Sequence, residues 1–303
     1  MRQLIVGGNG FIGKNLVGVL KKQHEADVIC VVQRPNESHG PNTLACDMLD
    51  PEAIRALLKG YYPDRVYFLV GSGRMGADEK NEDYFRSNFL TLSRFLEAAE
   101  PYKKPFQLFF TSTMHVYGNA AGEVAENTPV APVSYYGFTK YLAEKALEAF
   151  AKRNPEHQII VGRLYTCIGP GQGEGFVVPD LCKKIRELGS QGRGLVVRSP
   201  SSFRQFMDVR DMADLIPRLW DFSGRAHYEV INLSSIQVST IETIAKKLLE
   251  FSGVKSPLQP VPDPHNPFQG IRVKPDKLRS WVPAFPYRPL DETLRDVWQS
   301  SAR

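Results

Sequence analysis

The chain has 303 residues, of which 42% are hydrophobic and 23% are charged, and its formal net charge is +5. This composition excludes a disordered or low-complexity chain, and the length suits one large α/β domain or such a domain with a smaller lobe. Lys and Arg form no run of five or more residues, so nucleic acid is not an expected partner.

The sequence shows no sign of a metal site, a membrane span or a signal peptide. Its four cysteines form no CxxC pair, so we expect neither a metal nor a disulfide framework. No apolar stretch approaches the ~20 residues of a membrane span. The first apolar strand is predicted to begin at residue 2, so we do not expect a signal peptide. We therefore expect a soluble protein of the cytoplasm with no membrane contact.

Apolar strands alternate with amphipathic helices over the first half of the chain. This order predicts an α/β fold with a Rossmann-type, doubly wound parallel sheet and right-handed crossovers. We expect a dinucleotide-binding domain over residues 1–165 and a smaller α/β substrate lobe over 166–303, some of whose segments return to the first domain. The predicted elements are strands at 2–6, 27–33, 65–70, 106–111 and 157–162, and helices at 12–22, 51–59, 81–100 and 136–153.

A glycine cluster follows the first strand and opens the first helix. The stretch VGGNGFIG (6–13) can be parsed as GxGxxG from Gly8. Glycines at these places allow a tight turn and a close approach to a pyrophosphate, while the helix N-terminus offers free N–H groups. A tight turn without a ligand is the alternative. The residues expected at the cofactor are Gly7, Gly10, Phe11, Ile12 and Gly13.

The end of the second strand bears on the choice of cofactor. Gln33 and Arg34 stand where NAD-binding chains carry an acidic residue for the ribose. A guanidinium there can pair with a 2′-phosphate, so NADP(H) is favoured. NAD is the alternative if Arg34 is only a solvated loop residue. Asp47, followed by Met48, can accept a hydrogen bond from the adenine amino group or can cap a turn.

A YxxxK pattern opens the helix predicted at 136–153. Tyr136 and Lys140 are four residues apart and share one helix face. A lysine one turn away can lower the pKa of a tyrosine that must transfer a proton. The preceding strand, QLFFTST (107–113), ends in hydroxyls, and Thr113 can lie beside Tyr136. An ordinary amphipathic helix with a surface lysine is the alternative.

Several motifs occur together in one order along nearly the whole chain. They are Gly7-Gly10-Gly13, Thr113 followed by VYG, Tyr136-x-x-x-Lys140, RLYTCIGPGQ (163–172), FRQFMDVRDMA (203–213) and LDETLRDVW (290–298). Together they resemble the extended short-chain dehydrogenases/reductases that modify nucleotide sugars with NAD(P), most closely the GDP-4-keto-6-deoxy-hexose reductases. The resemblance implies a nucleotide-diphosphate sugar as substrate and a homodimer formed through the helices at 81–100 and 136–153.

The resemblance also implies roles for single residues. Tyr136 would be the general acid/base, Lys140 would bind the nicotinamide ribose, and Thr113 would take the place of the catalytic Ser/Thr. Two further groups would bind the ligands. The cofactor group is Leu69, Val70, Gly71 and Asn88, and the substrate group is Phe176 and Val177 beneath the nucleotide, Arg204 on the diphosphate and Arg272 as a second contact.

The chain departs from the family pattern at two places near the substrate. Met114 and His115 stand where hexose 4,6-dehydratases carry an acidic residue and the Glu that removes the C5 proton. Methionine cannot transfer a proton, whereas histidine can be a base or can only shape the sugar pocket. Thr166 replaces the asparagine that often contacts the substrate phosphate. Dehydration is therefore not expected.

Three functions remain. The favoured one is a 4-ketoreductase that uses NADPH on a nucleotide-linked 4-keto-6-deoxy sugar. The second is a nucleotide-sugar 4-epimerase with tightly bound NAD, because it needs the same Tyr136 and Thr113 and no additional base. The third is a non-catalytic dinucleotide-sensing protein on the same fold, which the complete set of Thr113, Tyr136 and Lys140 argues against.

Overall fold

A computed structural model describes most of the chain, but Arg34, the expected partner of a 2′-phosphate, lies outside the described residues. The segments described are 1–22, 27–33, 42–73, 80–120, 122–188, 194–222, 226–262 and 270–301.

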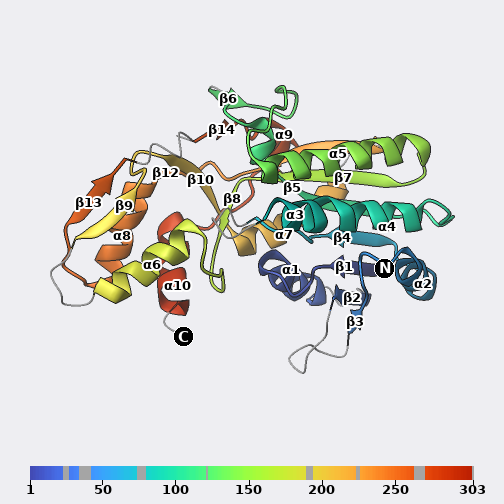
Figure 1. Cartoon of the computed structure of the whole chain (residues 1–303), viewed down its shortest axis with the longest axis horizontal. Helices are drawn as coiled ribbons and strands as arrows, with labels where there is room; N and C mark the ends of the chain where they lie inside the picture. Colours follow the sequence, from blue (N-terminus) through green and yellow to red (C-terminus); the bar gives the residue numbers. More distant parts are fainter. Residues whose placement is uncertain are drawn as a thin grey trace.

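A parallel sheet of seven strands forms the centre of the larger body and confirms the predicted fold class (Figure 1). The chain builds outward from β1 in one direction and from β4 in the other, so the switch point of the sheet lies between them. Ligands bind at such points, beyond the carboxyl ends of the strands. In spatial order the strands are β11 (Tyr228–Leu233), β7 (Gln158–Leu164), β5 (Gln107–Thr113), β4 (Arg65–Phe68), β1 (Arg2–Val6), β2 (Asp27–Val32) and β3 (Thr43–Ala45).

Helices cover both faces of this sheet, which explains its continuous apolar strands. Successive residues of one strand enter opposite cores: Leu4 and Val6 pack in one, and Ile5 packs in the other. The helices on the Leu4 side are α2 (Pro51–Tyr61), α4 (Thr91–Ala99) and α5 (Tyr135–Arg153). Those on the Ile5 side are α1 (Phe11–Lys21), α7 (Val209–Phe222) and α9 (Asp276–Trp281).

The single helix predicted at 81–100 is interrupted by a π-helical segment. The chain runs through α3 (Asn81–Tyr84), the π-helix η1 (Phe85–Leu90) and then α4. A π-helical turn rotates the residues that follow it relative to an α-helix, and such turns are frequent at functional sites. Asn88 lies in η1 and is fully buried.

The smaller body is built from the second half of the chain around its own apolar core (Figure 1). Three elements that follow residue 166, α7, β11 and α9, belong instead to the larger body. The smaller body and its connections contain the strands β8 (Thr166–Ile168), β10 (Phe203–Asp208), β12 (Val238–Thr240), β9 (Leu195–Arg198) and β13 (Leu258–Val261), the pair β6 (Glu123–Val124) and β14 (Arg272–Val273), and the helices α6 (Val177–Leu188), α8 (Ile241–Ser252) and α10 (Leu290–Ser300).

Within the described segments, none of the helices is both long enough and apolar enough to span a bilayer.

Candidate active site

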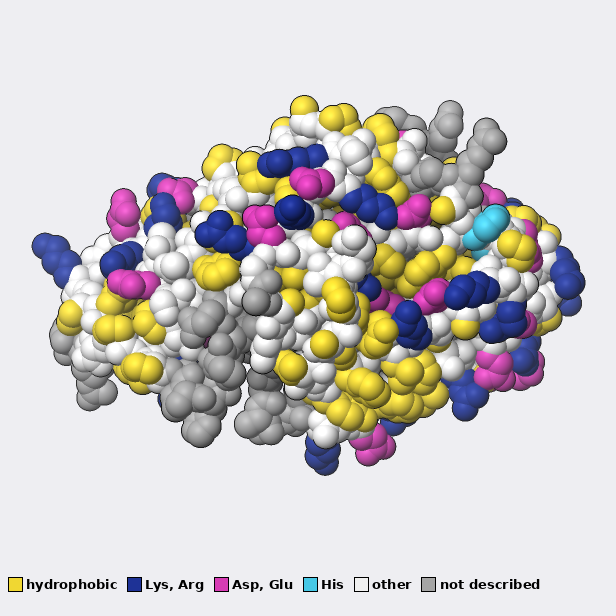
Figure 2. All heavy atoms as spheres, turned by 90° about the horizontal axis from the view of Figure 1, so that it is seen from above, with side chains coloured by type: hydrophobic (Ala, Val, Ile, Leu, Met, Phe, Trp, Pro, Cys, Tyr) yellow, Lys and Arg dark blue, Asp and Glu magenta, His cyan; other side chains and the backbone are white. Residues whose placement is uncertain are grey.

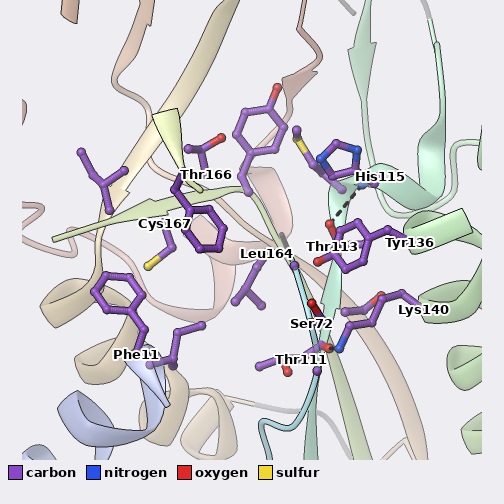
Figure 3. Close-up of a pocket in the computed structure, with 18 of the residues that line it drawn as sticks. Phe11, Ser72, Thr111, Thr113, His115, Tyr136, Lys140, Leu164, Thr166 and Cys167 are labelled. Carbon is purple, nitrogen blue, oxygen red and sulfur yellow. Dashed lines mark hydrogen bonds between the residues drawn. The ribbon is translucent and has the colours of Figure 1, made fainter. Parts of the chain in front are cut away.

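A cavity of about 820 Å³ lies beyond the carboxyl ends of the central strands and is lined by both bodies. Figure 3 shows Thr113, His115, Tyr136 and Lys140 along one side and Phe11 along the other. This is the position at which an open α/β sheet binds its ligand.

The glycine cluster forms a cradle at one end of the cavity. Gly7 has a φ of +90°, and a Cβ atom on Gly13 would lie 2.8 Å from the Cα atom of Gly8 and would overlap the carbonyl oxygen of Gly7. No side chain caps the N-terminus of α1 at Gly10, so its first N–H groups are available to an anion. These features fit a dinucleotide pyrophosphate. All five residues predicted here, Gly7, Gly10, Phe11, Ile12 and Gly13, line the cavity.

A second cavity of about 1000 Å³ continues from the first past the glycine cradle. The carboxylate of Asp47 accepts a hydrogen bond from the Leu49 N–H (2.9 Å), so it closes a turn as well as facing the cavity. A dinucleotide needs two such connected compartments, one for each nucleotide. Of the residues predicted at the cofactor, those lining the second cavity are Gly7, Gly10, Gln33, Asp47, Met48, Leu69, Val70 and Gly71.

The first turn of α5 places Tyr136 beside the end of β5. The Ser134 hydroxyl caps this helix by accepting a hydrogen bond from the Gly137 N–H (3.1 Å). A Cβ atom on Gly137 would lie 2.5 Å from the carbonyl oxygen of His115, so glycine allows the helix to approach this segment. The Thr113 hydroxyl hydrogen bonds with Tyr136 and also accepts one from the His115 N–H (3.3 Å). The predicted pairing of Thr113 and Tyr136 is thus present.

Lys140 reaches the same region from the next turn of α5. Its Nζ atom donates to the carbonyl oxygen of Thr111 (2.9 Å) and to that of Val70 (3.5 Å). Burial lowers the pKa of Lys140 to about 7, and the nearby Glu144 carboxylate opposes this shift. The lysine is therefore close to its own titration point at neutral pH.

The pKa of Tyr136 differs from the sequence-based expectation. Burial raises it, and the hydrogen bond with Thr113 only partly opposes the rise. The ammonium group of Lys140 donates instead to the backbone carbonyl of Thr111. The side chains of the site do not by themselves produce the lowering that the YxxxK spacing predicts.

Asn88 supports the cofactor side of the site from behind the cavity wall and does not line either cavity. Its amide oxygen accepts a hydrogen bond from the Ser72 N–H (2.9 Å), and its amide nitrogen donates to the Ser72 carbonyl (3.2 Å) and to the Thr139 hydroxyl (3.3 Å). It therefore connects the loop after β4 to the helix that carries Lys140. Ser72 and Thr139 were not predicted, although each adjoins a predicted residue.

Most residues predicted for the substrate surround the other end of the first cavity. Arg204 donates to the Ser202 hydroxyl (2.6 Å) and to the Phe203 carbonyl (2.7 Å). Arg272 does not line the described cavities; its guanidinium lies 5.6 Å from the Phe203 ring centroid. Its contact with the substrate stays a prediction. The predicted substrate residues that line the cavity are Met114, His115, Thr166, Phe176, Val177 and Arg204.

The segment RLYTCIGPGQ also supplies lining residues that were not predicted individually. Tyr165 is buried and its hydroxyl accepts a hydrogen bond from the Ile271 N–H (2.9 Å). Gln172 donates to the Cys167 carbonyl (2.9 Å). Both residues belong to the same RLYTCIGPGQ motif as Thr166, and this is the signal that could have identified them.

His115 stands next to Tyr136. Its ring lies edge-on to that of Tyr136, with centroids 5.5 Å apart. Burial, and to a lesser degree the positive charge of Arg204, lowers the pKa of His115 to about 4. The imidazole is therefore neutral at neutral pH and is a weak base. This favours its interpretation as part of the pocket wall.

Across the described segments, no group of three or more His, Cys, Asp or Glu side chains is arranged to hold a metal ion.

The glycine cradle, the strand-end threonine and the tyrosine–lysine helix define an NAD(P)-dependent enzyme of the extended short-chain dehydrogenase/reductase type. The chain belongs to the NAD dependent epimerase/dehydratase family, whose family model matches residues 3–234. The resemblance drawn from the motifs is thereby confirmed, and the non-catalytic alternative is set aside.

Its relatives include both dehydrogenases and epimerases that act on nucleotide sugars. A dTDP-6-deoxy-L-talose 4-dehydrogenase (NAD(P)(+)) of Kitasatospora kifunensis is 28% identical over 99% of this chain and 96% of its own length. A UDP-glucose 4-epimerase of Mycoplasma genitalium is 26% identical over 86% of this chain and 84% of its own. The crystal structure of a UDP-glucuronic acid 4-epimerase from Bacillus cereus, with UDP-glucuronic acid and NAD, has a TM-score of 0.87 and 22% identity, and covers 100% of this chain and 99% of that one.

Proposed function

We propose that this protein reduces the 4-keto group of a nucleotide-linked 4-keto-6-deoxy sugar, with NADPH as the reductant. The observation that carries the proposal is the pairing of Thr113 with Tyr136 beside Met114 and a neutral His115. Thr113 and Tyr136 suit proton transfer at a hydroxyl or ketone. Met114 and His115 do not provide the carboxylate that dehydration requires. The similarity to a sugar-nucleotide 4-dehydrogenase over 99% of the chain supports the same reaction class.

The nicotinamide, when bound, supplies the hydride for the sugar C4. The protein's own residues act on the oxygen of that carbon. Tyr136 donates its phenolic proton to the developing alkoxide, and the Thr113 hydroxyl, already hydrogen bonded to Tyr136, stabilises the same oxygen. Lys140 holds the ribose hydroxyls with its ammonium group.

The substrate end of the cavity has the groups that a sugar nucleotide requires. Arg204 presents a positive charge among the residues that line it, which suits the diphosphate. Phe176 and Val177 offer apolar surface from the start of α6. We place the nucleotide over these side chains and the sugar against Met114, His115 and Tyr136.

The preference for NADPH rests on the residues at the end of β2. Gln33 lines the second cavity there, at the position where NAD-binding chains carry a carboxylate. We expect Arg34→Ala to weaken NADPH binding at least about tenfold while NADH binding changes little. Equal weakening of both cofactors, measured by fluorescence titration, would refute the preference for NADP(H).

A 4-epimerase is the second candidate, because the same Thr113 and Tyr136 suffice and a UDP-glucose 4-epimerase is among the relatives. The cofactor bound after purification and the need for added NADPH in the assay distinguish the two functions. NADPH oxidation that depends on a 4-keto sugar nucleotide supports the reductase. Tightly held NAD after purification, with interconversion of 4-epimers and no need for added NADPH, supports the epimerase.

The direct test of the site is Tyr136→Phe. We expect it to abolish turnover, because it removes the phenol that we propose donates the proton to the sugar oxygen, while cofactor binding stays within about threefold of wild type. An active Phe variant would contradict the assignment of Tyr136.

We also propose that the protein forms a homodimer through the outer faces of α4 and α5. Tyr135 and Phe138 on α5 are 39% and 49% exposed. Figure 2 shows hydrophobic side chains gathered along the lower edge of the half of the molecule that holds these helices. Light scattering at assay concentration tests this, with Phe138→Glu expected to give a monomer.

A further inference from the structure

The ring of Tyr136 contacts a second tyrosine that has no part in the steps proposed above. This residue is Tyr84, the last residue of α3. The centroids of the two rings are 6.0 Å apart, with an angle of 47° between the ring planes. Aromatic rings attract one another at such separations. Only 6% of Tyr84 is exposed, and it does not line either described cavity. It therefore meets the site through Tyr136 and not through the proposed ligands.

The π-helix η1 determines the direction in which Tyr84 points. It begins at Phe85, directly after Tyr84. A π-helical turn holds one extra residue relative to an α-helix, in which each residue turns the chain by about 100°. Tyr84 thus takes the place around the axis that Phe85 would have in an uninterrupted helix. In agreement, Tyr84 is buried and Phe85 is half-buried.

A second side chain of the same segment contacts the beginning of α5. Asn88, four residues after Tyr84, donates its amide N–H to the Thr139 hydroxyl (3.3 Å). Thr139 in turn donates this hydroxyl to the carbonyl oxygen of Tyr136 (3.0 Å). Both α3 and η1 pack against α5. The α3–η1 segment therefore holds Tyr136 at two points, its backbone carbonyl and its ring.

Three separate groups meet the side chain of Tyr136. The Thr113 hydroxyl at the end of β5 hydrogen bonds with it. The His115 ring, from the short helix after β5, lies with its centroid 5.5 Å from that of Tyr136, and the Tyr84 ring comes from α3. One hydrogen bond fixes the phenolic oxygen, whereas the plane of the ring is fixed by packing. A proton donor needs both, because its geometry must be held to about 0.5 Å.

We propose that Tyr84 is a positioning residue that holds the ring of Tyr136, so that the phenolic oxygen stays beside Thr113 at the cavity. This inference rests on the proposed function, in which Tyr136 is the proton donor. Tyr84 acts through its ring and does not touch the substrate. A phenylalanine ring should therefore serve in its place, and an aliphatic side chain should not.

The direct test observes the Tyr136 ring by fluorine NMR of the full-length protein labelled with 3-fluorotyrosine. The resonance of Tyr136 is identified by its absence from the spectrum of Tyr136→Phe. In Tyr84→Leu we expect this resonance to shift and to broaden, because the ring loses the neighbour that packs on it. In Tyr84→Phe, which keeps that neighbour, we expect the wild-type line width and a much smaller shift.

The second measurement is NADPH oxidation with GDP- and dTDP-linked 4-keto-6-deoxyhexoses. The kcat of Tyr84→Leu should fall about tenfold to a hundredfold, because a proton donor that is displaced by about 1 Å loses its alignment with the sugar oxygen. The KM for the sugar nucleotide should stay within about twofold of wild type, since Tyr84 makes no contact with the substrate. Tyr84→Phe should keep at least about half of the wild-type kcat.

Phe95→Leu is the matched control for the loss of a buried ring. Phe95 is fully buried on α4, where its ring packs on those of Phe68 and Phe106. This change should lower the urea midpoint of unfolding about as much as Tyr84→Leu does, and should leave the Tyr136 resonance and kcat unchanged. If Tyr84→Leu does not fold, Tyr84→Met is measured instead, because its longer side chain fills more of the space.

An unchanged Tyr136 resonance in the folded aliphatic variant would overturn the proposal. An equal loss of kcat in Tyr84→Phe would also overturn it, because the effect would then belong to the hydroxyl and not to the ring. The same holds for equal losses in Phe95→Leu and Tyr84→Leu, which reduced stability would explain. The fluorine measurement contains no substrate, so it decides the role of Tyr84 even where no sugar nucleotide is turned over and the proposed function fails.

Discussion

A Cβ atom on residue 71 would lie 2.5 Å from the Nζ atom of Lys140, so Gly71 leaves the space that the lysine side chain occupies. The same atom would lie 2.7 Å from the amide oxygen of Asn88. Both neighbours are held by hydrogen bonds to the backbone. The loop after β4, the π-helix and α5 therefore meet at a point where only glycine fits.

We expect Gly71→Ala to weaken NAD(P)H binding at least about tenfold, which corresponds to about 1.4 kcal/mol. The methyl group would displace Lys140 or Asn88 from the cofactor side of the site. The control is Gly18→Ala, on α1, where a new Cβ would meet no atom within 4 Å. That change should leave binding intact and stabilise the protein by about 0.5–1 kcal/mol. If Gly71→Ala left the affinity for NAD(P)H unchanged, Lys140 could move aside without loss of cofactor binding.

The neutral state of His115 leads to a second prediction. With a pKa of about 4, its protonation cannot account for a change in turnover between pH 5.5 and 8. His115→Gln should therefore raise the KM for the sugar nucleotide about three- to tenfold through altered contacts, with the shape of the pH profile retained. Disappearance of a limb of the profile in this variant would instead identify His115 as a base.

The cap of α5 provides a third prediction. Ser134→Ala removes the hydrogen bond to the Gly137 N–H and should lower the free energy of unfolding by about 1 kcal/mol. Because Tyr136 lies in this first turn, kcat should also fall. Thr240→Ala, which removes the corresponding cap of α8 in the other body, should cost a similar amount of stability with kcat unchanged. If Ser134→Ala and Thr240→Ala lowered kcat equally, the loss of activity in Ser134→Ala would reflect reduced stability alone.

A buried histidine far from the site makes stability depend on pH. His157 accepts a hydrogen bond from the Phe106 N–H (3.1 Å) at Nδ1 and stacks on the Phe106 ring at 4.0 Å. Burial lowers its pKa, so below pH 6.5 the unfolded chain takes up a proton before the folded chain does. The free energy of unfolding should therefore fall as the pH drops from 7.5 to 5, with His115 acting in the same direction.

Urea unfolding at these two pH values measures this dependence. His157→Asn keeps an acceptor for the Phe106 N–H but cannot be protonated, so its loss of stability on acidification should be smaller than that of the wild type. The same change at exposed His227 is the control. An identical dependence in His157→Asn and wild type would exclude His157 as a source of acid sensitivity.

The parts of the site that the sequence predicts are those encoded in short spacings. Gly7, Gly10 and Gly13 follow an apolar strand directly, and Tyr136 and Lys140 are one turn apart on one helix, so local pattern is sufficient to place each group. The predicted sheet is confirmed for the same reason, because its strands are continuous apolar runs separated by amphipathic helices. The π-helix around Asn88 was not predicted, since one shifted turn barely alters the apolar period.

By itself, the sequence determined the class of fold, the glycine cradle and the Thr113–Tyr136–Lys140 set, each through short motifs and their order along the chain. Only the tertiary structure decided the charge states of these groups. Burial raises the pKa of Tyr136 and lowers those of Lys140 and His115, and Arg163, from another strand, fixes the carboxylate of Glu144. Desolvation and ion pairing depend on which distant segments pack together, and a linear pattern carries no measure of that.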